Sequence, residues 1–191
     1  MKISRDTKRS ERRRNNIPSV AITGYTNAGK SSLLNRLTGA DVLVENALFA
    51  TLDPTVRKTE SSDGRIYTLV DTVGFVRHLP HQLVEAFKST LEEVSESDLI
   101  VHVVDGSHPD PQEQLRAVRE VIREIGGGEI PEIIAINKAD IAPPEKIMQL
   151  LREEANSFAF SARTGFGIET LVAAIESSLP RPRVEIKAVI P

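Results

Sequence analysis

The sequence lacks cysteine altogether, which excludes a disulfide framework and any metal site built on thiolates. It also lacks tryptophan, and its 4% aromatic content argues against a surface that binds nucleic acids by stacking bases. No apolar run approaches the roughly 20 residues that a membrane span needs, and no signal-peptide pattern opens the chain. We therefore expect a cytoplasmic protein without a membrane span, whose 191 residues fold as one domain held by packing alone.

Charge is unevenly distributed along the chain. The net charge is −3, yet residues 1–14 carry seven Lys and Arg residues against two acidic ones, so this segment is about +5 and the rest about −8. A basic segment of this kind is commonly a solvated helix end or tail, and less commonly a contact to nucleic acid. Both interpretations stay open from the sequence.

Short apolar runs alternate with amphipathic segments through most of the chain. The expected strands lie at 18–23, 65–71, 98–107, 132–140 and 157–163. The expected helices are the "GKSSLLNRLTG" segment and segments near 82–94, 110–125, 144–155 and 167–178. Residues 40–58 are expected to be mainly loop, and 56–61 could pair antiparallel with the next strand through a turn at Asp63–Gly64. The alternation predicts an α/β fold, with a mainly parallel six-stranded sheet, one antiparallel strand and helices on both faces.

The segment "GYTNAGKS" at 24–31 has the spacing of a phosphate-binding loop and lies between an expected strand and an expected helix. Gly24 and Gly29 would let backbone N–H groups converge on phosphate oxygens at the positive end of the helix. Lys30 would place its charge on the β- and γ-phosphates, and Ser31 would offer its hydroxyl to Mg²⁺. The motif predicts a nucleotide site at the carboxyl ends of the strands.

Two further motifs end later strands and indicate which nucleotide binds. In "DTVG" at 71–74, Asp71 could hold a magnesium-bound water and Gly74 could present its N–H to a γ-phosphate. In "NKAD" at 137–140, Asp140 could accept hydrogen bonds from guanine N1–H and from the exocyclic amino group. Adenine lacks that pattern and would leave the carboxylate unpaired, so the motifs together indicate GTP.

The remaining residues of these two strand ends would complete the guanine site. Asn137 would tie the loops together, and Lys138 would lie along the purine face. In the "SAR" segment at 161–163, the backbone N–H of Ala162 would donate to guanine O6.

This motif set resembles that of the Ras-like, translation-factor class of P-loop GTPases. The longer stretches "GYTNAGKSSLLNRLTG", "NALFATLDPTVR" and "DTVGFVRHLPHQLVEAFKSTLEE" are similar to the GTPase domain of the HflX family, over about residues 15–180. The resemblance implies a GTPase that binds the large ribosomal subunit and splits stalled or stressed ribosomes. The family normally carries an N-terminal domain and a helical region before the GTPase domain, and we expect this chain to be the GTPase domain of a longer protein.

The resemblance also divides the chain. Residues 1–16 are expected to be the basic end of the helical linker, 17–180 the GTP-binding domain, and 181–191 a tail or the start of a further element. The basic segment would then face ribosomal RNA or simply belong to the linker. We expect the isolated domain to be monomeric.

Magnesium would be held by Ser31, Asp71 and a threonine of the loop before the second strand, where Thr51 and Thr55 compete. Thr51 lies twenty residues from both Ser31 and Asp71 and matches the "FATLD" of the family, so we favour Thr51. The position where many GTPases carry a water-orienting glutamine is Phe75, which cannot hydrogen-bond a water. We therefore expect slow intrinsic hydrolysis that needs help from outside.

Asn27 has two competing interpretations. Some GTPases of this class use an asparagine here to coordinate K⁺ against the β- and γ-phosphates, in place of an arginine finger. Alternatively, Asn27 only tolerates an unusual loop backbone. We expect Lys30, Thr51, Gly74 and Asn27 to act in hydrolysis, with Mg²⁺ and K⁺ as the candidate ions. The expected nucleotide-binding residues are Gly24, Tyr25, Thr26, Asn27, Ala28, Gly29, Lys30, Ser31, Ser32, Phe49, Ala50, Thr51, Leu52, Asp53, Asp71, Thr72, Val73, Gly74, Asn137, Lys138, Asp140, Ser161, Ala162 and Arg163.

Two alternatives to a ribosome-linked GTP switch remain. One is another ribosome-assembly GTPase with the same core, which the "RHLPHQLVEAFKSTLEE" stretch disfavours. The other is a GTP-binding interaction module with negligible hydrolysis, which Phe75 makes credible. Turnover measured with and without large ribosomal subunits would separate the switch from the module.

Overall fold

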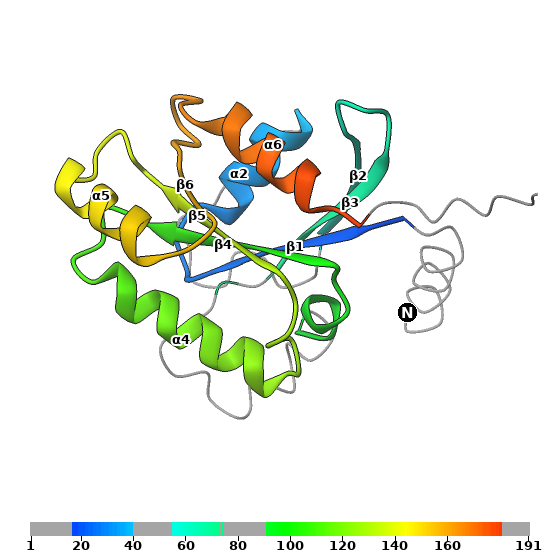
Figure 1. The fold of residues 1–191 in the computed structure, drawn as a ribbon, viewed down its shortest axis with the longest axis horizontal. Coiled ribbons are helices and arrows are strands. Elements are labelled where there is room, and N and C mark those ends of the chain that lie inside the picture. The colour runs from blue at the N-terminus through cyan, green and yellow to red at the C-terminus, as the bar shows by residue number, and fades with distance from the viewer. Residues whose placement is uncertain (1–16, 40–54, 73, 75–90, 181–191) are drawn as a thin grey trace, which may run out of the picture.

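The computed structural model describes residues 17–39, 55–72, 74 and 91–180 (Figure 1). The strands are β1 (Ser19–Gly24), β2 (Thr55–Glu60), β3 (Ile66–Asp71), β4 (Leu99–Asp105), β5 (Glu132–Asn137) and β6 (Ser157–Ala159). The helices are α2 (Lys30–Thr38), α4 (Pro111–Glu124), α5 (Pro144–Glu153) and α6 (Ile168–Ser178), and residues 91–95 are also helical. The expected linker 1–16 and tail 181–191 lie outside the described residues. Within the described ranges, no helix is long and apolar enough to cross a membrane.

The strands form one six-stranded sheet in the order β2-β3-β1-β4-β5-β6. Only β2 runs antiparallel to its neighbour β3, and every other neighbouring pair is parallel. The predicted α/β fold is therefore confirmed, including its single antiparallel strand. The register pairs Ile22 with Asp71 and Asp105 with Asn137, so the motif-bearing strand ends meet at one edge of the sheet.

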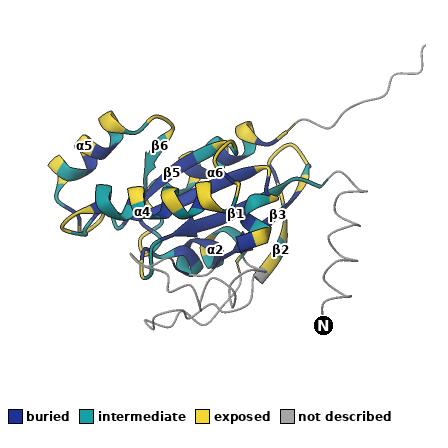
Figure 2. Ribbon diagram, turned by 90° about the horizontal axis from the view of Figure 1, so that it is seen from below, coloured by how far each residue is buried: buried dark blue, intermediate teal, exposed yellow. Residues whose placement is uncertain are grey.

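Helices cover both faces of the sheet, with α2 and α6 on one side and α4 on the other (Figure 1). The first layer buries Leu33 and Leu34 of α2 and Leu171 and Ile175 of α6 against β1, β3, β4 and β5. The second layer buries apolar side chains of α4 and α5 against the opposite face, as the dark ribbon of the central strands in Figure 2 shows. Burial on both faces explains why the central strands are apolar at almost every position.

The strands end earlier than the sequence predicted. β5 stops at Asn137 and β6 at Ala159, whereas we expected strands to 140 and 163. Lys138 has φ 64, a left-handed conformation that cannot continue a strand, so the motif residues turn out into loops. The antiparallel pairing expected for 56–61 is confirmed, because β2 (Thr55–Glu60) pairs with β3, so the loop expected over 40–58 ends before Thr55.

The β2–β3 hairpin is fastened to the last helix. Its turn closes through the Ser61 N–H on the Arg65 carbonyl (2.8 Å), which confirms the turn expected around Asp63–Gly64. The Ser62 N–H and Oγ donate to the Glu176 carboxylate at 3.1 and 2.6 Å, and the Arg65 guanidinium donates to the Glu176 carbonyl at 2.9 Å. The hairpin thereby holds the end of α6 beside the sheet.

Candidate functional site

The segment Gly24–Ser31 joins β1 to α2, as predicted for a phosphate-binding loop. Gly24 (φ 146) and Gly29 (φ 98) hold backbone conformations that other residues rarely adopt, and a Cβ at Gly24 would overlap the carbonyl of Val103. The Lys30 side chain is buried, and its Nζ donates to the Tyr25 carbonyl at 3.1 Å. The lysine is therefore folded back over the loop at the amino-terminal end of α2.

Burial lowers the pKa of Lys30 to about 8, although the nearby Asp71 carboxylate opposes this shift. An anionic ligand beside Lys30 would stabilise its charged form, which burial destabilises. Ser31 lies beside the same carboxylate, and its Oγ donates to Asp71 Oδ2 at 2.9 Å. A hydroxyl and a carboxylate side by side form the oxygen donor set that Mg²⁺ prefers, so Ser31 and Asp71 fit a bound magnesium.

Gly74 of the DTVG motif lies against the phosphate loop. Thr72 is buried, and its Oγ1 donates to the Ile22 carbonyl at 2.7 Å, which fixes the exit of β3 against β1. A Cβ added to Gly74 would come within 2.7 Å of Thr26 Cγ2 and 3.2 Å of Lys30 Nζ. Glycine therefore lets the backbone lie close to Thr26 and to the lysine head, which fits the expected contact of the Gly74 N–H to a terminal phosphate.

Asn137 joins the phosphate loop to the loop after β6. It is buried, its Nδ2 donates to the Ala28 carbonyl at 2.8 Å, and its Oδ1 accepts the Ala162 N–H at 3.0 Å. Because this N–H is the donor we expected for guanine O6, a bound base would share it with Asn137 or replace that acceptor. The predicted role of Asn137 as a tie between loops matches this geometry.

Replacing Gly29 by alanine is expected to lower the free energy of unfolding by about 2–4 kcal/mol, measured by urea denaturation. The new Cβ would overlap Asn137 Nδ2 and break its hydrogen bond to Ala28, in addition to the strain of a left-handed backbone. Gly39→Ala is the matched control, because Gly39 has φ 64 and nothing within 4 Å of its added Cβ. Equal losses in the two variants would contradict the close approach to Asn137.

The residues expected to bind guanine form a charged cluster at the carboxyl ends of β5 and β6. Arg163 donates to Asp140 Oδ2 through Nε (2.9 Å) and Nη2 (2.5 Å). A hydrogen bond from Ser161, helped by Arg163, holds the pKa of Asp140 below its usual value, so this carboxylate is ionised at neutral pH. Lys138 Nζ contacts Asp105 Oδ2 at 2.6 Å, which places the lysine stem along the same edge.

Other expected site residues are only partly placed. Asn27 is exposed with φ 61, which accords with a backbone role, while its proposed contact to K⁺ stays a prediction. Thr55 begins β2 opposite Asp71 in the register, and the choice between it and Thr51 stays untested. The expected residues that lie outside the described part of the chain are Phe49, Ala50, Thr51, Leu52, Asp53, Val73 and Phe75.

Sequence reasoning missed two side chains that shape this site. Asp105 anchors Lys138, and its position at the end of an apolar strand was a signal that could have identified it. Arg36 contacts the loop after β6 from α2, and no local pattern marks it. Its partners are distant in the sequence and meet it only in the fold.

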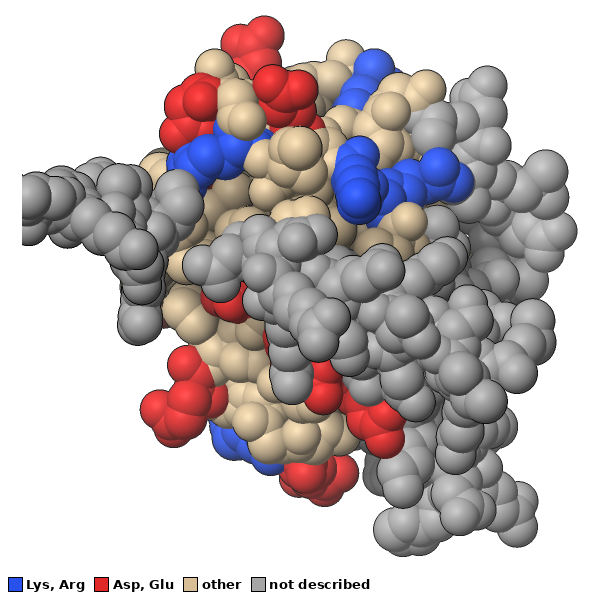
Figure 3. Space-filling view, turned by 90° about the vertical axis from the view of Figure 1, so that its right-hand side faces the viewer, with Lys and Arg blue, Asp and Glu red and all other residues tan. Residues whose placement is uncertain are grey.

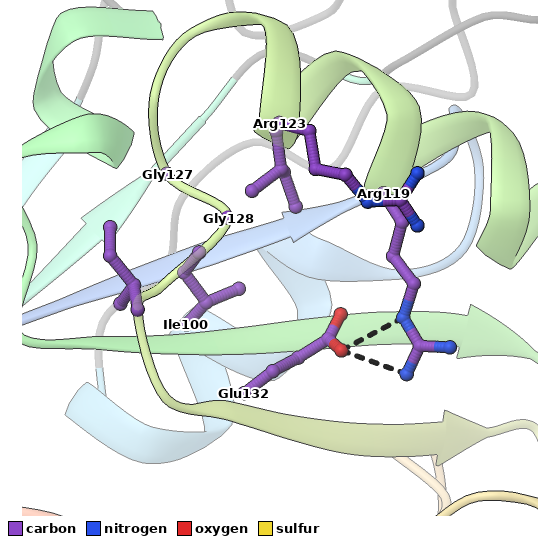
Figure 4. Close-up of a pocket in the computed structure, with 8 residues that line it drawn as sticks. Ile100, Arg119, Arg123, Gly127, Gly128 and Glu132 are labelled. Carbon is purple, nitrogen blue, oxygen red and sulfur yellow. Dashed lines mark hydrogen bonds and ion pairs between the residues drawn. The ribbon is translucent and has the colours of Figure 1, made fainter.

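A separate hollow of about 260 Å³ lies at the other end of the sheet, where β4 and β5 begin (Figure 4). Ile100 lies at its base, and the Arg119–Glu132 ion pair (2.8 Å) forms one wall. Glu132 also contacts the buried His102 Nδ1 at 2.8 Å. Since the phosphate loop follows the carboxyl end of β1, this hollow is not part of the nucleotide site.

Residues 19–138 match the family model described as "50S ribosome-binding GTPase". The chain is 49% identical over 176 residues to GTPase HflX of Caldanaerobacter subterraneus subsp. tengcongensis, which covers 92% of this chain and 40% of that protein. It is 43% identical over 177 residues to GTPase HflX of Escherichia coli, covering 92% and 42%. The chain thus spans less than half the length of these curated relatives.

Solved structures share the fold. A GTP-binding protein of Sulfolobus solfataricus in complex with GDP has a TM-score of 0.68 and 31% identity, covering 93% of this chain and 57% of that one. Era in complex with MgGDPNP and a 16S ribosomal RNA segment has a TM-score of 0.71 at 24% identity, covering 89% and 59%. The second likeness shows the fold alone.

Proposed function

Because this chain belongs to the 50S ribosome-binding GTPase family and carries an HflX-type GTPase domain, we propose that it is a GTP-driven switch on the large ribosomal subunit. It would bind GTP at the carboxyl edge of the sheet, hydrolyse it to GDP and phosphate, and split stalled ribosomes in the cytoplasm under stress. The observation that carries this proposal is the meeting of a buried lysine, a serine–aspartate pair and the Asn137 tie at one edge of the sheet.

Each group at this edge has a role in phosphoryl transfer to water, which needs positioning and charge neutralisation more than covalent chemistry. Lys30 neutralises charge on the β- and γ-phosphates, and backbone N–H groups of the phosphate loop bind their oxygens. Gly74 places its N–H near the γ-phosphate, and the water oxygen attacks that phosphorus as the bond to the bridging oxygen breaks. Magnesium held by Ser31, Asp71 and Thr51 would supply further positive charge when bound.

The loops after β5 and β6 would recognise the base. Asp140, kept ionised, accepts the two donors of guanine, and Lys138 and Arg163 flank the base. Adenine would leave this carboxylate without its two hydrogen bonds, which is why GTP is preferred to ATP.

The water-orienting step depends on groups other than Phe75, so the isolated chain should turn over slowly. We propose that a K⁺ ion near Asn27 supplies part of the missing charge. The exposure of Asn27 leaves its side chain free of the core for such a role.

The ribosomal RNA contact is assigned to the basic segment 1–14, which carries about +5. On the face seen in Figure 3, the Lys and Arg side chains of described residues lie mainly in the upper part, and Asp and Glu side chains lie at the upper left and in the lower part.

The test is GTP turnover in Na⁺ and in K⁺ buffer, each with and without purified large ribosomal subunits. We expect large ribosomal subunits to raise the rate of GTP hydrolysis at least tenfold. In other GTPases, a partner that supplies a missing charge-stabilising group raises the hydrolysis rate by a larger factor. K⁺ should raise the rate of the wild type and not of an Asn27→Ala variant. A near-zero rate under all four conditions would contradict the switch and favour a GTP-binding interaction module.

A further inference from the structure

We propose that Arg36 is a positioning residue for the guanine-binding loop, an inference that rests on the proposed function. Arg36 lies in the last turn of α2, the helix that begins at the phosphate loop. Its Nε donates to the Ala162 carbonyl at 3.1 Å, and its Nη2 donates to the Arg163 carbonyl at 2.8 Å. One guanidinium therefore holds two consecutive carbonyls of the loop that should face the base.

The backbone of Ala162 is held from two directions. Asn137 Oδ1 accepts its N–H, and Arg36 donates to its carbonyl. Since a residue has only two soft backbone dihedrals, fixing both polar groups leaves the Ala162 backbone little freedom. The direction of the Ala162 N–H, which would meet guanine O6, thus depends on Arg36 as well as on Asn137.

These contacts connect the phosphate loop with the loop expected to bind the base. Asn137 also donates to the Ala28 carbonyl in the phosphate loop, and α2 leads from that loop to Arg36. The guanidinium lies beside the turn after Ala162, because a Cβ added to Gly165 would come within 3.9 Å of its atoms. The base loop is therefore held at the Ala162 N–H by the Asn137 side chain and at the carbonyls of Ala162 and Arg163 by Arg36.

The chemistry of arginine suits this task. Its planar guanidinium presents several N–H donors at fixed angles, so it can reach two neighbouring carbonyls at once. A lysine at the same position could bond one carbonyl and would leave the second free to turn. Because Arg36 is exposed, its removal should alter the geometry of the loop more than the stability of the fold.

The test compares Arg36→Ala and Arg36→Lys with the wild type, using the whole chain. Affinities are measured for GDP, for inosine diphosphate, which lacks the 2-amino group, and for 6-thioguanosine diphosphate, whose sulfur is a weak acceptor. Arg36→Ala should bind GDP about tenfold more weakly, the effect of losing a well-oriented hydrogen bond. It should also lose most of its preference for GDP over the 6-thio analogue, while its preference for GDP over inosine diphosphate stays unchanged. The GDP affinity of Arg36→Lys and its preference for GDP over the 6-thio analogue should lie between those of Arg36→Ala and the wild type.

The matched control is Arg116→Ala. Arg116 is an exposed arginine on α4 whose Nε donates to the Gln112 carbonyl of its own helix at 3.3 Å, and its loss should leave all three affinities unchanged. Unchanged GDP affinity in Arg36→Ala, or an equal loss for GDP and its 6-thio analogue, would overturn the inference. Failure of the wild type to bind any guanine nucleotide would overturn the proposed function, and this inference with it.

Discussion

Replacing Lys30 by alanine is expected to weaken GTP binding about a thousandfold and to abolish turnover. Truncating one partner of a buried charge pair typically costs several kcal/mol, and about 4 kcal/mol corresponds to this factor. Lys30 is buried at the amino-terminal end of α2 with its head beside Gly74, so no other described cation is placed to replace it. Titration calorimetry with a slowly hydrolysed GTP analogue measures the loss.

The pH profile of binding separates loss of the Lys30 charge from a general distortion. The pKa of Lys30 is about 8 without ligand, and phosphate charge raises it, so binding takes up a proton above pH 8. Affinity in the wild type should therefore fall as pH rises from 8 to 9, by up to about tenfold per unit. The Lys30→Ala variant should show a flat profile, and a parallel fall in both proteins would contradict the assignment.

A second control tests whether any lysine would give this result. Lys146 on α5 donates to the carbonyls of His108 and Pro109 at 3.2 and 3.1 Å, away from the phosphate loop. Lys146→Ala should leave GTP affinity and its pH dependence unchanged.

Replacing Asp140 by asparagine is expected to lower GTP affinity on the order of a hundredfold to a thousandfold and to favour XTP. In the proposed site, the carboxylate would accept hydrogen bonds from both N1–H and the 2-amino group of guanine, whereas an amide would turn one donor towards that amino group. Xanthine carries an oxygen at this position, so the same amide donor finds an acceptor. Competition of GTP and XTP for a fluorescent nucleotide measures the change in preference.

The control for this change is Asp110→Asn. Asp110 accepts the Glu113 N–H at 2.9 Å as the cap of α4, and asparagine caps helices about equally well. It should therefore keep the wild-type preference for GTP. If Asp140→Asn also retained that preference, Asp140 could not be the residue that selects the base.

The motif residues and the sheet could be predicted because both depend on short-range patterns. Several apolar runs end in aspartate or asparagine, which predicted that these polar ends lie together at one edge of the sheet. The register of Asp105 with Asn137 confirms this for β4 and β5. The start of α4 is likewise marked by local sequence, because Asp110 caps the helix and Pro111 lies in its first turn. Local sequence carries this information because helix ends and buried strands have strong residue preferences.

Contacts across long sequence separations could not be predicted in the same way. Arg36 and Ala162 are 126 residues apart, and neither residue type signals the other. The ends of β5 and β6 were also misplaced, because the left-handed backbone at Lys138 is set by its tertiary surroundings rather than by lysine itself. A single chain offers no pattern from which either feature follows.

The left-handed residues of this fold gather in its loops, and two of them, Asn27 and Lys138, lie at the nucleotide edge. Such conformations cost free energy of order 1 kcal/mol or more each, so they persist only where the surrounding structure enforces them. Here the Asn137 bond to Ala28 supports the first loop and the Asp105 ion pair supports the second. The site is thus preorganised, because the conformational entropy of ordering these loops is lost when the chain folds and not when the nucleotide binds. The binding energy of the nucleotide then contributes to affinity and to stabilising the transition state.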